Sequence, residues 1–256
     1  MEDEKKTFTG MKENHIEGRN AVLEAFRSGR TIDKLYVLDG CQDGPVRSIT
    51  REARKHDTIV NYVTKERLDQ ISETGKHQGV IAVSAAYDYA RVEDILALAE
   101  KKGEPPFILI LDGIEDPHNL GAIIRTANQA GAHGVIIPKR RAVGLTPTVA
   151  RTSAGAGNYV PGAKVTNISN TMKELKDRGM WFVCADMDGT LMYDMDLTGP
   201  IGLVIGNEGD GVSPLVKKNC DMVASIPMKG DIDSLNASVA AGVLSYEIVR
   251  QRMKKG

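Results

Sequence analysis

The hydrophobic residues of the first part of the chain switch repeatedly between helical and strand spacing. In GRNAVLEAFRSGR, at 18–30, the apolar positions recur at helical intervals, and the strand pattern DKLYVL follows directly. The same alternation continues with a helix near 45–56, a strand at 59–63, a helix near 64–74 and a strand at 79–85. We therefore predict a small α/β domain at 12–86.

A helix followed by two prolines separates this domain from the rest of the chain. VEDILALAEKKG predicts a helix that ends at Gly103, and Pro105 and Pro106 then force an extended backbone. We place a linker helix and the domain boundary at 87–105. A second domain is predicted at 106–256.

The second domain contains strands that are apolar almost throughout, separated by amphipathic helices. The strand FILIL at 107–111 is followed by a helix at 119–130, in which Asn119 is placed to cap the first turn. The remaining predicted elements are a strand at 134–138, a short helix near 146–153, a helix at 169–178, strands at 181–186, 202–206 and 222–227, a short helix at 213–219 and a last helix from about 235 to 254. Strands of this kind are typical of a mainly parallel α/β sheet with helices on both faces.

Composition narrows the class of protein. With 256 residues and 41% hydrophobic residues, the chain can bury a substantial core. No apolar run is long enough to cross a bilayer, and the charged start MEDEKKTF does not resemble a secretory signal, so we expect a cytoplasmic protein without membrane contact. The three cysteines lack C-x-x-C spacing, which indicates free thiols and no metal site.

Charge is unevenly distributed along the chain. The 57 residues 117–173 contain no Asp or Glu, although 34 acids in 256 residues would give roughly eight. Seven basic residues lie in this segment, and they favour a polyanion as partner. The alternative is that the acidic region 186–233 neutralises the segment within the fold.

Three polar, glycine-rich loops follow predicted strands: GIEDPHNLGAIIR, GNEGDGVSP and PMKGDIDSLNASVAAG. In a parallel α/β sheet, ligands bind at the carboxyl ends of the strands, so these loops are the candidate site. None of the three matches G-x-G-x-x-G or the P-loop, which disfavours an ordinary dinucleotide or nucleoside triphosphate site.

The motifs in these loops resemble those of the SPOUT superfamily, in particular the SpoU/TrmH-type RNA ribose 2′-O-methyltransferases. They are N-L-G-x-x-x-R at 119–125, G-N-E-G at 206–209 and S-L-N-x-S at 234–238. Residues 12–86 are similar to the L30e-like substrate-binding domain of the branch that acts on guanosine in large-subunit (23S) rRNA. The resemblance implies a Rossmann-like catalytic domain tied in a trefoil knot, a homodimer, an RNA substrate and no metal.

The resemblance also implies S-adenosylmethionine as the methyl donor. Held largely by backbone groups, it would lie against Gly206, Ile226, Met228 and Leu235. Gly206 allows a close backbone approach, and the three apolar side chains can contact an adenine ring. Ordinary packing at strand ends is the alternative reading of these four residues.

Five polar residues correspond to catalytic positions of the family: Asn119, Arg125, Glu208, Ser234 and Asn236. The family assigns Arg125 to the attacking hydroxyl. A guanidinium has too high a pKa to act as a base, so we favour electrostatic stabilisation of the developing alkoxide and contact with the adjacent phosphate. Without the resemblance, these residues read as helix caps, a turn residue and an exposed arginine. Arg151, Arg140 and Arg141 are further candidates for RNA contact.

Three other functions remain open at this stage. The nearest is methylation of a tRNA ribose, and the next is RNA binding without catalysis. The third is a haloacid-dehalogenase-type phosphatase, because FVCADMDGTL presents Asp186 as a nucleophile and Asp188 as an acid, with KGDID at 229–233 as Mg²⁺ ligands. Only 65 residues follow Leu191, which is short for that fold.

Overall fold

The computed structural model of the chain describes residues 15–231 and 234–255. The first residues of the predicted domain 12–86 and the end of KGDID therefore lie outside the described residues. The chain divides into two compact units. One contains the chain up to Ala86 with Leu145–Pro147, and the other contains Tyr87–Gly144 and the chain from Thr148 onward.

The first unit is a four-stranded sheet with three helices. Its strand order is β1-β4-β2-β3, in which only β2 and β3 are parallel. The elements are β1 (His15–Glu17), α1 (Arg19–Arg27), β2 (Ile32–Leu38), α2 (Gly44–Lys55), β3 (Ile59–Val63), α3 (Lys65–Ile71) and β4 (Val80–Ser84). Every helix and strand predicted for this region is present, and β1 is additional.

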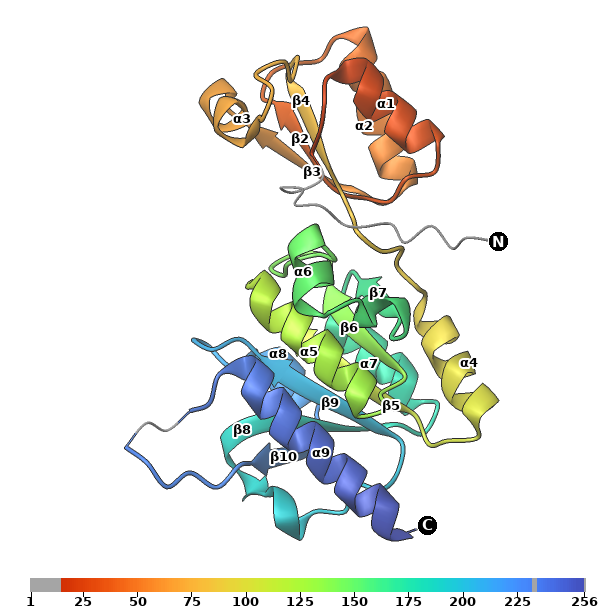
Figure 1. The fold of residues 1–256 in the computed structure, drawn as a ribbon, viewed down its shortest axis with the longest axis vertical. Coiled ribbons are helices and arrows are strands. Elements are labelled where there is room, and N and C mark those ends of the chain that lie inside the picture. Colours follow the sequence, from red (N-terminus) through yellow and green to blue (C-terminus); the bar gives the residue numbers. More distant parts are fainter. Residues whose placement is uncertain (1–14, 232–233, 256) are drawn as a thin grey trace, which may run out of the picture. The chain divides into compact units, whose positions relative to one another are not determined.

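The two faces of this sheet bury different residues. Leu35 and Val37 of β2 join the core formed with α1 and α2, to which Val46 and Ile49 belong. Helix α3 contacts β2 and buries Leu68. Because side chains alternate across a strand, the sheet separates α3 from the other two helices (Figure 1).

The second unit is built on a six-stranded, wholly parallel sheet. Its order is β10-β8-β9-β5-β6-β7. The elements are α4 (Val92–Lys102), β5 (Phe107–Asp112), α5 (Pro117–Gln129), β6 (Gly134–Pro138), α6 (Pro147–Thr152), β7 (Gly162–Val165), α7 (Ile168–Lys176), β8 (Trp181–Leu191), β9 (Ile201–Gly206), α8 (Pro214–Lys218), β10 (Met222–Ser225) and α9 (Ala237–Lys255). The predicted parallel α/β class is confirmed. The trefoil knot stays a prediction.

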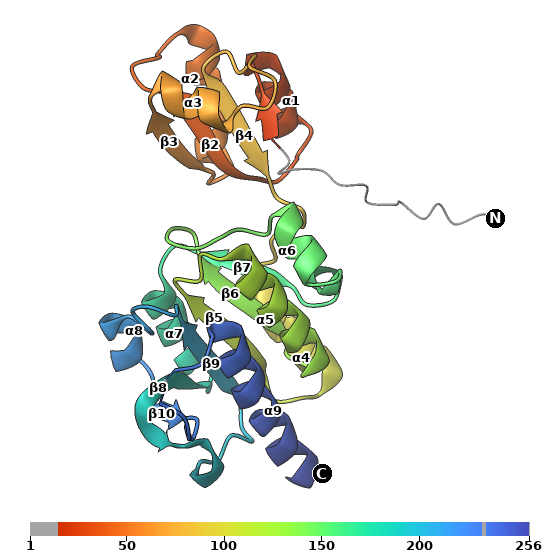
Figure 2. The same ribbon diagram turned by 60° about the vertical axis from the view of Figure 1, so that its left-hand side comes forward.

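Helices cover both faces of this sheet. Ile95 of α4 and Met172 of α7 share one core with Ile108 and Ile110 of β5. Helices α5 and α9 contact each other, and both views show them side by side over the sheet (Figures 1 and 2). No helix among the described residues is long and apolar enough to cross a membrane.

The start of α5 differs from the prediction. The capping residue is Asp116, whose Oδ1 accepts a 2.8 Å hydrogen bond from the amide of His118, and Pro117 occupies the first helical position. Proline fits there because its missing N–H would have no partner within the helix. The prediction that Asn119 caps this helix is therefore wrong. Asn119 lies in the first turn and is only 7% exposed.

Candidate active site

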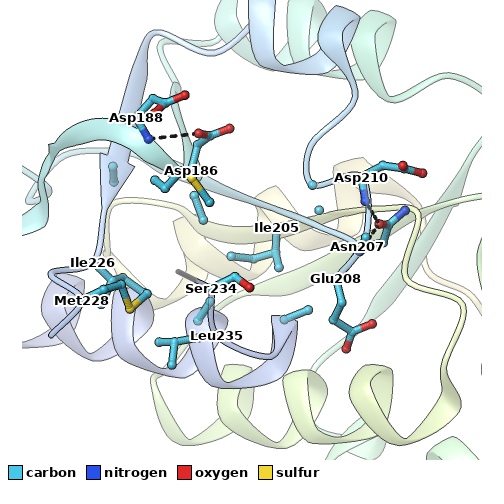
Figure 3. Close-up of a pocket in the computed structure, with 18 residues that line it drawn as sticks. Asp186, Asp188, Ile205, Asn207, Glu208, Asp210, Ile226, Met228, Ser234 and Leu235 are labelled. Atoms are coloured by element: carbon cyan, nitrogen blue, oxygen red, sulfur yellow. Dashed lines mark hydrogen bonds between the residues drawn. The ribbon is translucent and has the colours of Figure 1, made fainter. Parts of the chain in front are cut away.

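A pocket of about 500 Å³ lies at the carboxyl ends of β9 and β10 and beside the middle of β8, just after β8 stops pairing with β9 (Figure 3). Ligand pockets commonly have this size. Its lining includes all four residues predicted to contact the cofactor, which are Gly206, Ile226, Met228 and Leu235. Figure 3 shows Ile226, Met228 and Leu235 at one end, away from Glu208. The three apolar side chains therefore gather on one side of the pocket, where Asp186 and Asp188 also lie.

Gly206 is required by the path of the following loop. A Cβ built on Gly206 would lie 2.0 Å from the carbonyl carbon of Gly211, a backbone atom that cannot rotate away. The loop between these glycines is held by Asn207, whose Oδ1 accepts hydrogen bonds from the amides of Gly209 (2.9 Å) and Asp210 (2.6 Å). The loop thus folds back on the end of β9 at a distance that only glycine permits.

Three residues from the three motifs are joined by hydrogen bonds. Asn119 Nδ2 donates to Glu208 Oε1. Asn236 Nδ2 lies 2.9 Å from the same carboxylate oxygen and 3.1 Å from Asn119 Oδ1. Asn119 and Glu208 are 89 residues apart in the sequence, and Glu208 and Asn236 are 28 apart. The three motifs therefore meet within one chain. We call these three residues the polar triad.

Asn236 has a second role at the start of α9. Its Oδ1 accepts hydrogen bonds from the amide of Ser238 at 2.9 Å and of Val239 at 3.4 Å, in the manner of a helix cap. Asn236 thus caps α9, as the sequence allowed, and is also a member of the polar triad. Ser234 lines the pocket and is exposed.

Gly121, the glycine of the N-L-G-x-x-x-R motif in α5, is also required by close packing. A Cβ on Gly121 would lie 1.7 Å from Thr152 Oγ1 and 3.1 Å from the amide nitrogen of Ser153. The first turn of α5 can therefore lie directly against the end of α6 only with glycine at this position. This contact fixes the turn that carries Asn119.

Two aspartates that the sequence assigned to another reaction also line the pocket. Asp186 accepts a 2.6 Å hydrogen bond from Lys217 Nζ, and this ion pair holds the pKa of the Asp186 carboxyl below its usual value. Strand β8 continues past Asp188 to Leu191, so the D-x-D-G-T segment does not form the loop of a phosphatase. Among the described residues, no three His, Cys, Asp or Glu side chains form a metal-binding group.

Sequence reasoning missed Asp186 and Asp188 as pocket residues because their motif resembles that of a different enzyme class. The signal was nonetheless available. Asp186 and Asp188 stand at the end of the predicted strand 181–186 of a mainly parallel sheet, in which ligands bind at the carboxyl ends of the strands. The structure shows that this strand is a parallel neighbour of β9, which ends at Gly206.

Arg125 lies away from the pocket of its own chain. It is exposed on α5, does not line the pocket and makes no side-chain hydrogen bond or ion pair among the described residues. Six residues separate it from Asn119, which on an α-helix amounts to a turn of about 120° and a rise of about 9 Å. A single chain thus brings Asn119, Glu208 and Asn236 together and leaves Arg125 outside.

The three arginines predicted to contact RNA are all exposed, and Arg140 and Arg141 are neighbours in the loop after β6. Arg151 lies on α6 and donates to Thr148 Oγ1 at 3.2 Å. In the acidic region 186–233, Asp186 and Asp221 pair with Lys217 and Lys176, each at 2.6 Å.

The fold and site define a class of protein, a two-unit α/β protein whose ligand pocket is lined by the second and third loops and by β8. Residues 106–246 match the model of the SpoU rRNA methylase family. Residues 15–90 match the model of the RNA 2′-O ribose methyltransferase substrate-binding domain. The chain belongs to the SpoU rRNA methylase family.

Relatives resemble the chain over nearly its whole length. YacO of Bacillus subtilis (strain 168), assigned to the TrmH family of tRNA/rRNA methyltransferases, is 48% identical over 95% of this chain and 98% of its own. The SpoU methyltransferase AviRb from Streptomyces viridochromogenes, solved with AdoMet, is 28% identical with a TM-score of 0.61 over 94% of this chain and 91% of its own. An AdoMet-bound rRNA methyltransferase from Sinorhizobium meliloti is 25% identical, with a TM-score of 0.58 over 92% and 86%.

The pocket residues fit AdoMet, S-adenosylmethionine. Ile226, Met228 and Leu235 would suit an adenine ring, which is flat and apolar on its faces. The carboxylates of Asp188 and Glu208 would suit the positively charged sulfonium and amino groups. S-adenosylmethionine is the cofactor of this family, and the predicted cofactor is confirmed.

Proposed function

We propose that this protein methylates the ribose 2′-hydroxyl of a guanosine in large-subunit rRNA, with S-adenosylmethionine as the donor. The observation that carries the proposal is the polar triad, which joins all three motifs at the edge of the cofactor pocket. The match of the first unit to an RNA substrate-binding domain supports RNA as the acceptor.

The reaction forms a bond between the 2′-oxygen and the methyl carbon while the bond from that carbon to sulfur breaks. Bound S-adenosylmethionine supplies the methyl group on a positively charged sulfur, a good leaving group. The polar triad fixes the loops that hold the acceptor ribose in line with this carbon, and such positioning is worth several orders of magnitude in rate. The hydroxyl proton leaves to a phosphate oxygen or to water.

Arg125 contributes charge to this step. Its guanidinium stays protonated at neutral pH, because its pKa above about 12 excludes a role as base. It binds the phosphate beside the target ribose and stabilises the negative charge that develops on the 2′-oxygen. Because Arg125 lies away from its own pocket, a second copy of the chain supplies it in this proposal. The active site is then shared between two chains.

The outer face of α9 supports a homodimer. Val239, Tyr246 and Met253 recur every seven residues and are 48%, 52% and 77% exposed. This spacing places them in one row along the helix, and such apolar rows are typical of helix–helix contacts. Helix α5, which carries Arg125, packs beside α9. A dimer formed through this face would bring the α5 helices of two copies near each other's pockets.

The exposed arginines Arg140, Arg141 and Arg151 would bind phosphates around the target. Phosphate contacts position an RNA, while its shape and unstacked bases specify it. They belong to the segment 117–173, which has no acidic residue. The net positive charge of this segment attracts RNA to the catalytic unit.

A methyl-transfer assay on two RNA pools tests the proposal. The full-length protein would be incubated with S-adenosylmethionine labelled in its methyl group and either rRNA or tRNA from cells that lack it. We expect label in 2′-O-methylguanosine from large-subunit rRNA, identified by mass spectrometry of nucleosides. Label in tRNA alone would contradict the proposed rRNA substrate and favour methylation of a tRNA ribose. RNA binding with a flat calorimetric titration of S-adenosylmethionine would favour a non-catalytic RNA-binding protein.

A further inference from the structure

The first unit has a groove of its own, separate from the cofactor pocket. It measures about 530 Å³ and is bounded by the loop after β2, the outer side of α2 and the end of β3. Arg47, Arg51 and Arg54 line it from α2, and Tyr62 lines it from β3. We call these four residues the arginine–tyrosine groove.

The three arginines share one side of α2. They are spaced by four and three residues, which places them on one face of a helix. Val46 and Ile49 of the same helix are buried in the core, so this face is the solvent side. The side chains of Arg47 and Arg54 make no hydrogen bond or ion pair within the described part of the chain, and Arg51 lies 4.0 Å from Glu52. The structure of this unit therefore does not use the charges of Arg47 and Arg54, and it uses that of Arg51 only through this long ion pair.

Tyr62 places an aromatic ring beside these charges. It lies on β3, the edge strand, in register with Val37, which belongs to the core under α1 and α2. Paired residues of parallel strands face the same side, so the ring lies on the α2 side of the sheet. It is 54% exposed. An exposed ring next to guanidinium groups can stack on a nucleic acid base.

Two acidic residues lie near the groove, and Asp39 is one of its lining residues. Asp39 Oδ1 accepts a 2.9 Å hydrogen bond from the Gly40 amide. Asp43 caps α2 through the Val46 amide at 3.1 Å and pairs with Arg19 at 2.6 Å. The charged side chains that line the groove are therefore three arginines and one carboxylate, that of Asp39, and their sum is positive.

We propose that the arginine–tyrosine groove binds a single-stranded segment of the RNA substrate, with phosphates on Arg47, Arg51 and Arg54 and a base stacked on Tyr62. The proposal rests on the proposed function, because it assumes an RNA acceptor, and it names the part of the first unit that holds it. Single-stranded RNA is the class favoured here, because a base must be unpaired to stack on a side chain.

Binding of a fluorescein-labelled oligouridine of about 20 nucleotides to the full-length protein tests this proposal. We expect the triple substitution Arg47→Ala, Arg51→Ala, Arg54→Ala to weaken binding at least ten-fold at low salt. The slope of log affinity against log salt should fall by about 2, since each phosphate contact on a single strand contributes about 0.7. Tyr62→Ala should weaken binding about ten-fold, and Tyr62→Phe should restore it, because stacking needs only the ring.

Lys65→Ala with Arg67→Ala is the matched control, since both residues are exposed on α3, across the sheet from α2. This variant should bind within two-fold of the wild type. Calorimetry with S-adenosylmethionine should give the same affinity for every variant, because the cofactor pocket belongs to the other unit.

The outcomes separate the groove from the proposed function. If the triple variant binds oligouridine with the affinity and the salt slope of the wild type, the proposal that the groove binds RNA is wrong. It is also wrong if the wild-type protein does not bind oligouridine. Neither result would affect a methyl transfer measured on rRNA. Conversely, absence of methyl transfer by a wild-type protein whose RNA binding depends on these four residues would overturn the proposed function and leave the groove supported.

Discussion

Asn119 illustrates what single residues reveal before a structure is known. The motif N-L-G-x-x-x-R marked it as a site residue, and the structure gives it Glu208 and Asn236 as partners. The sequence could not give its local role, because Asp116 and Pro117 provide a better helix start three residues earlier. Its partners were also beyond prediction, since spacing along the chain does not show which loop residues touch.

Arg125 yields the first prediction. Arg125→Ala should reduce kcat for RNA methylation by about 10²- to 10³-fold, the loss expected when one charged group that stabilises a transition state is removed. The affinity for S-adenosylmethionine should not change, because Arg125 does not line the pocket of its own chain. Single-turnover assays and calorimetry measure the two quantities.

Arg178→Ala is the control for this prediction, because Arg178 is an exposed arginine after α7, outside the site. It should retain wild-type turnover. If Arg125→Ala turns over at the wild-type rate, the role given to Arg125 is wrong.

Gly206 yields the second prediction. Gly206→Ala adds a Cβ 2.0 Å from the Gly211 backbone, so the loop must move. We expect a loss of about 2 kcal/mol or more in stability and at least ten-fold weaker binding of S-adenosylmethionine. Thermal unfolding and calorimetry provide these values. Gly199→Ala is matched, because a Cβ there meets no atom within 4 Å, and it should behave as wild type.

At the level of elements, the pattern of apolar residues predicted most helices and strands. It missed short strands and a strand end that form only through contact with neighbouring strands. Strand β1 has three residues and β7 has four, too few for a periodic signal. Strand β8 extends five residues beyond the predicted WFVCAD. Its polar end was not expected in a strand, but Thr190 and Leu191 pair with β10 after a shift in register.

Glu17, at the end of strand β1, makes the stability of the first unit depend on pH. Burial raises the pKa of Glu17, but hydrogen bonds from the Thr74 and Ser72 hydroxyls and from the Glu73 and Thr74 amides outweigh it and lower the pKa to about 2. The folded pKa lies below the unfolded one, so the stabilisation is fully present above about pH 4.5 and is lost as the pH falls toward 2.

Glu17→Gln should therefore destabilise the first unit at neutral pH by about 1 kcal/mol, a value reduced because solvent reaches the site. The difference from wild type should shrink as the pH falls from 4.5 toward 2. Denaturant unfolding at a series of pH values measures it. Glu24→Gln serves as control, since Glu24 is 71% exposed and lies 4.0 Å from Arg27. A difference that does not vary with pH would contradict the ionic origin.

At the level of the whole molecule, function is divided between the two units. The cofactor pocket belongs to the second unit and the arginine–tyrosine groove to the first. The sequence indicated this division through its two α/β patterns and its motifs. It could not show which chain supplies Arg125, because a sequence contains no information on distance between copies.

The assembly gives the last prediction. Val239→Glu with Tyr246→Glu places two charges in the exposed row of α9 and should convert the proposed dimer into a monomer at micromolar concentration. Light scattering after size-exclusion chromatography measures the mass. Leu215→Glu, on α8 and 61% exposed in the wild type, is the control and should leave the mass unchanged. A wild-type protein that is monomeric under these conditions would refute the dimer.

Asn236 belongs to two structures at once, since one end of its amide caps α9 and the other binds Glu208. A shift of α9 therefore displaces the carboxylate beside the cofactor pocket. If a second copy holds α9 in place, separation of the copies lets Glu208 move at the edge of the pocket. It also removes the Arg125 of the other copy. Dilution should then lower the activity per molecule more steeply than the loss of a shared arginine alone would do.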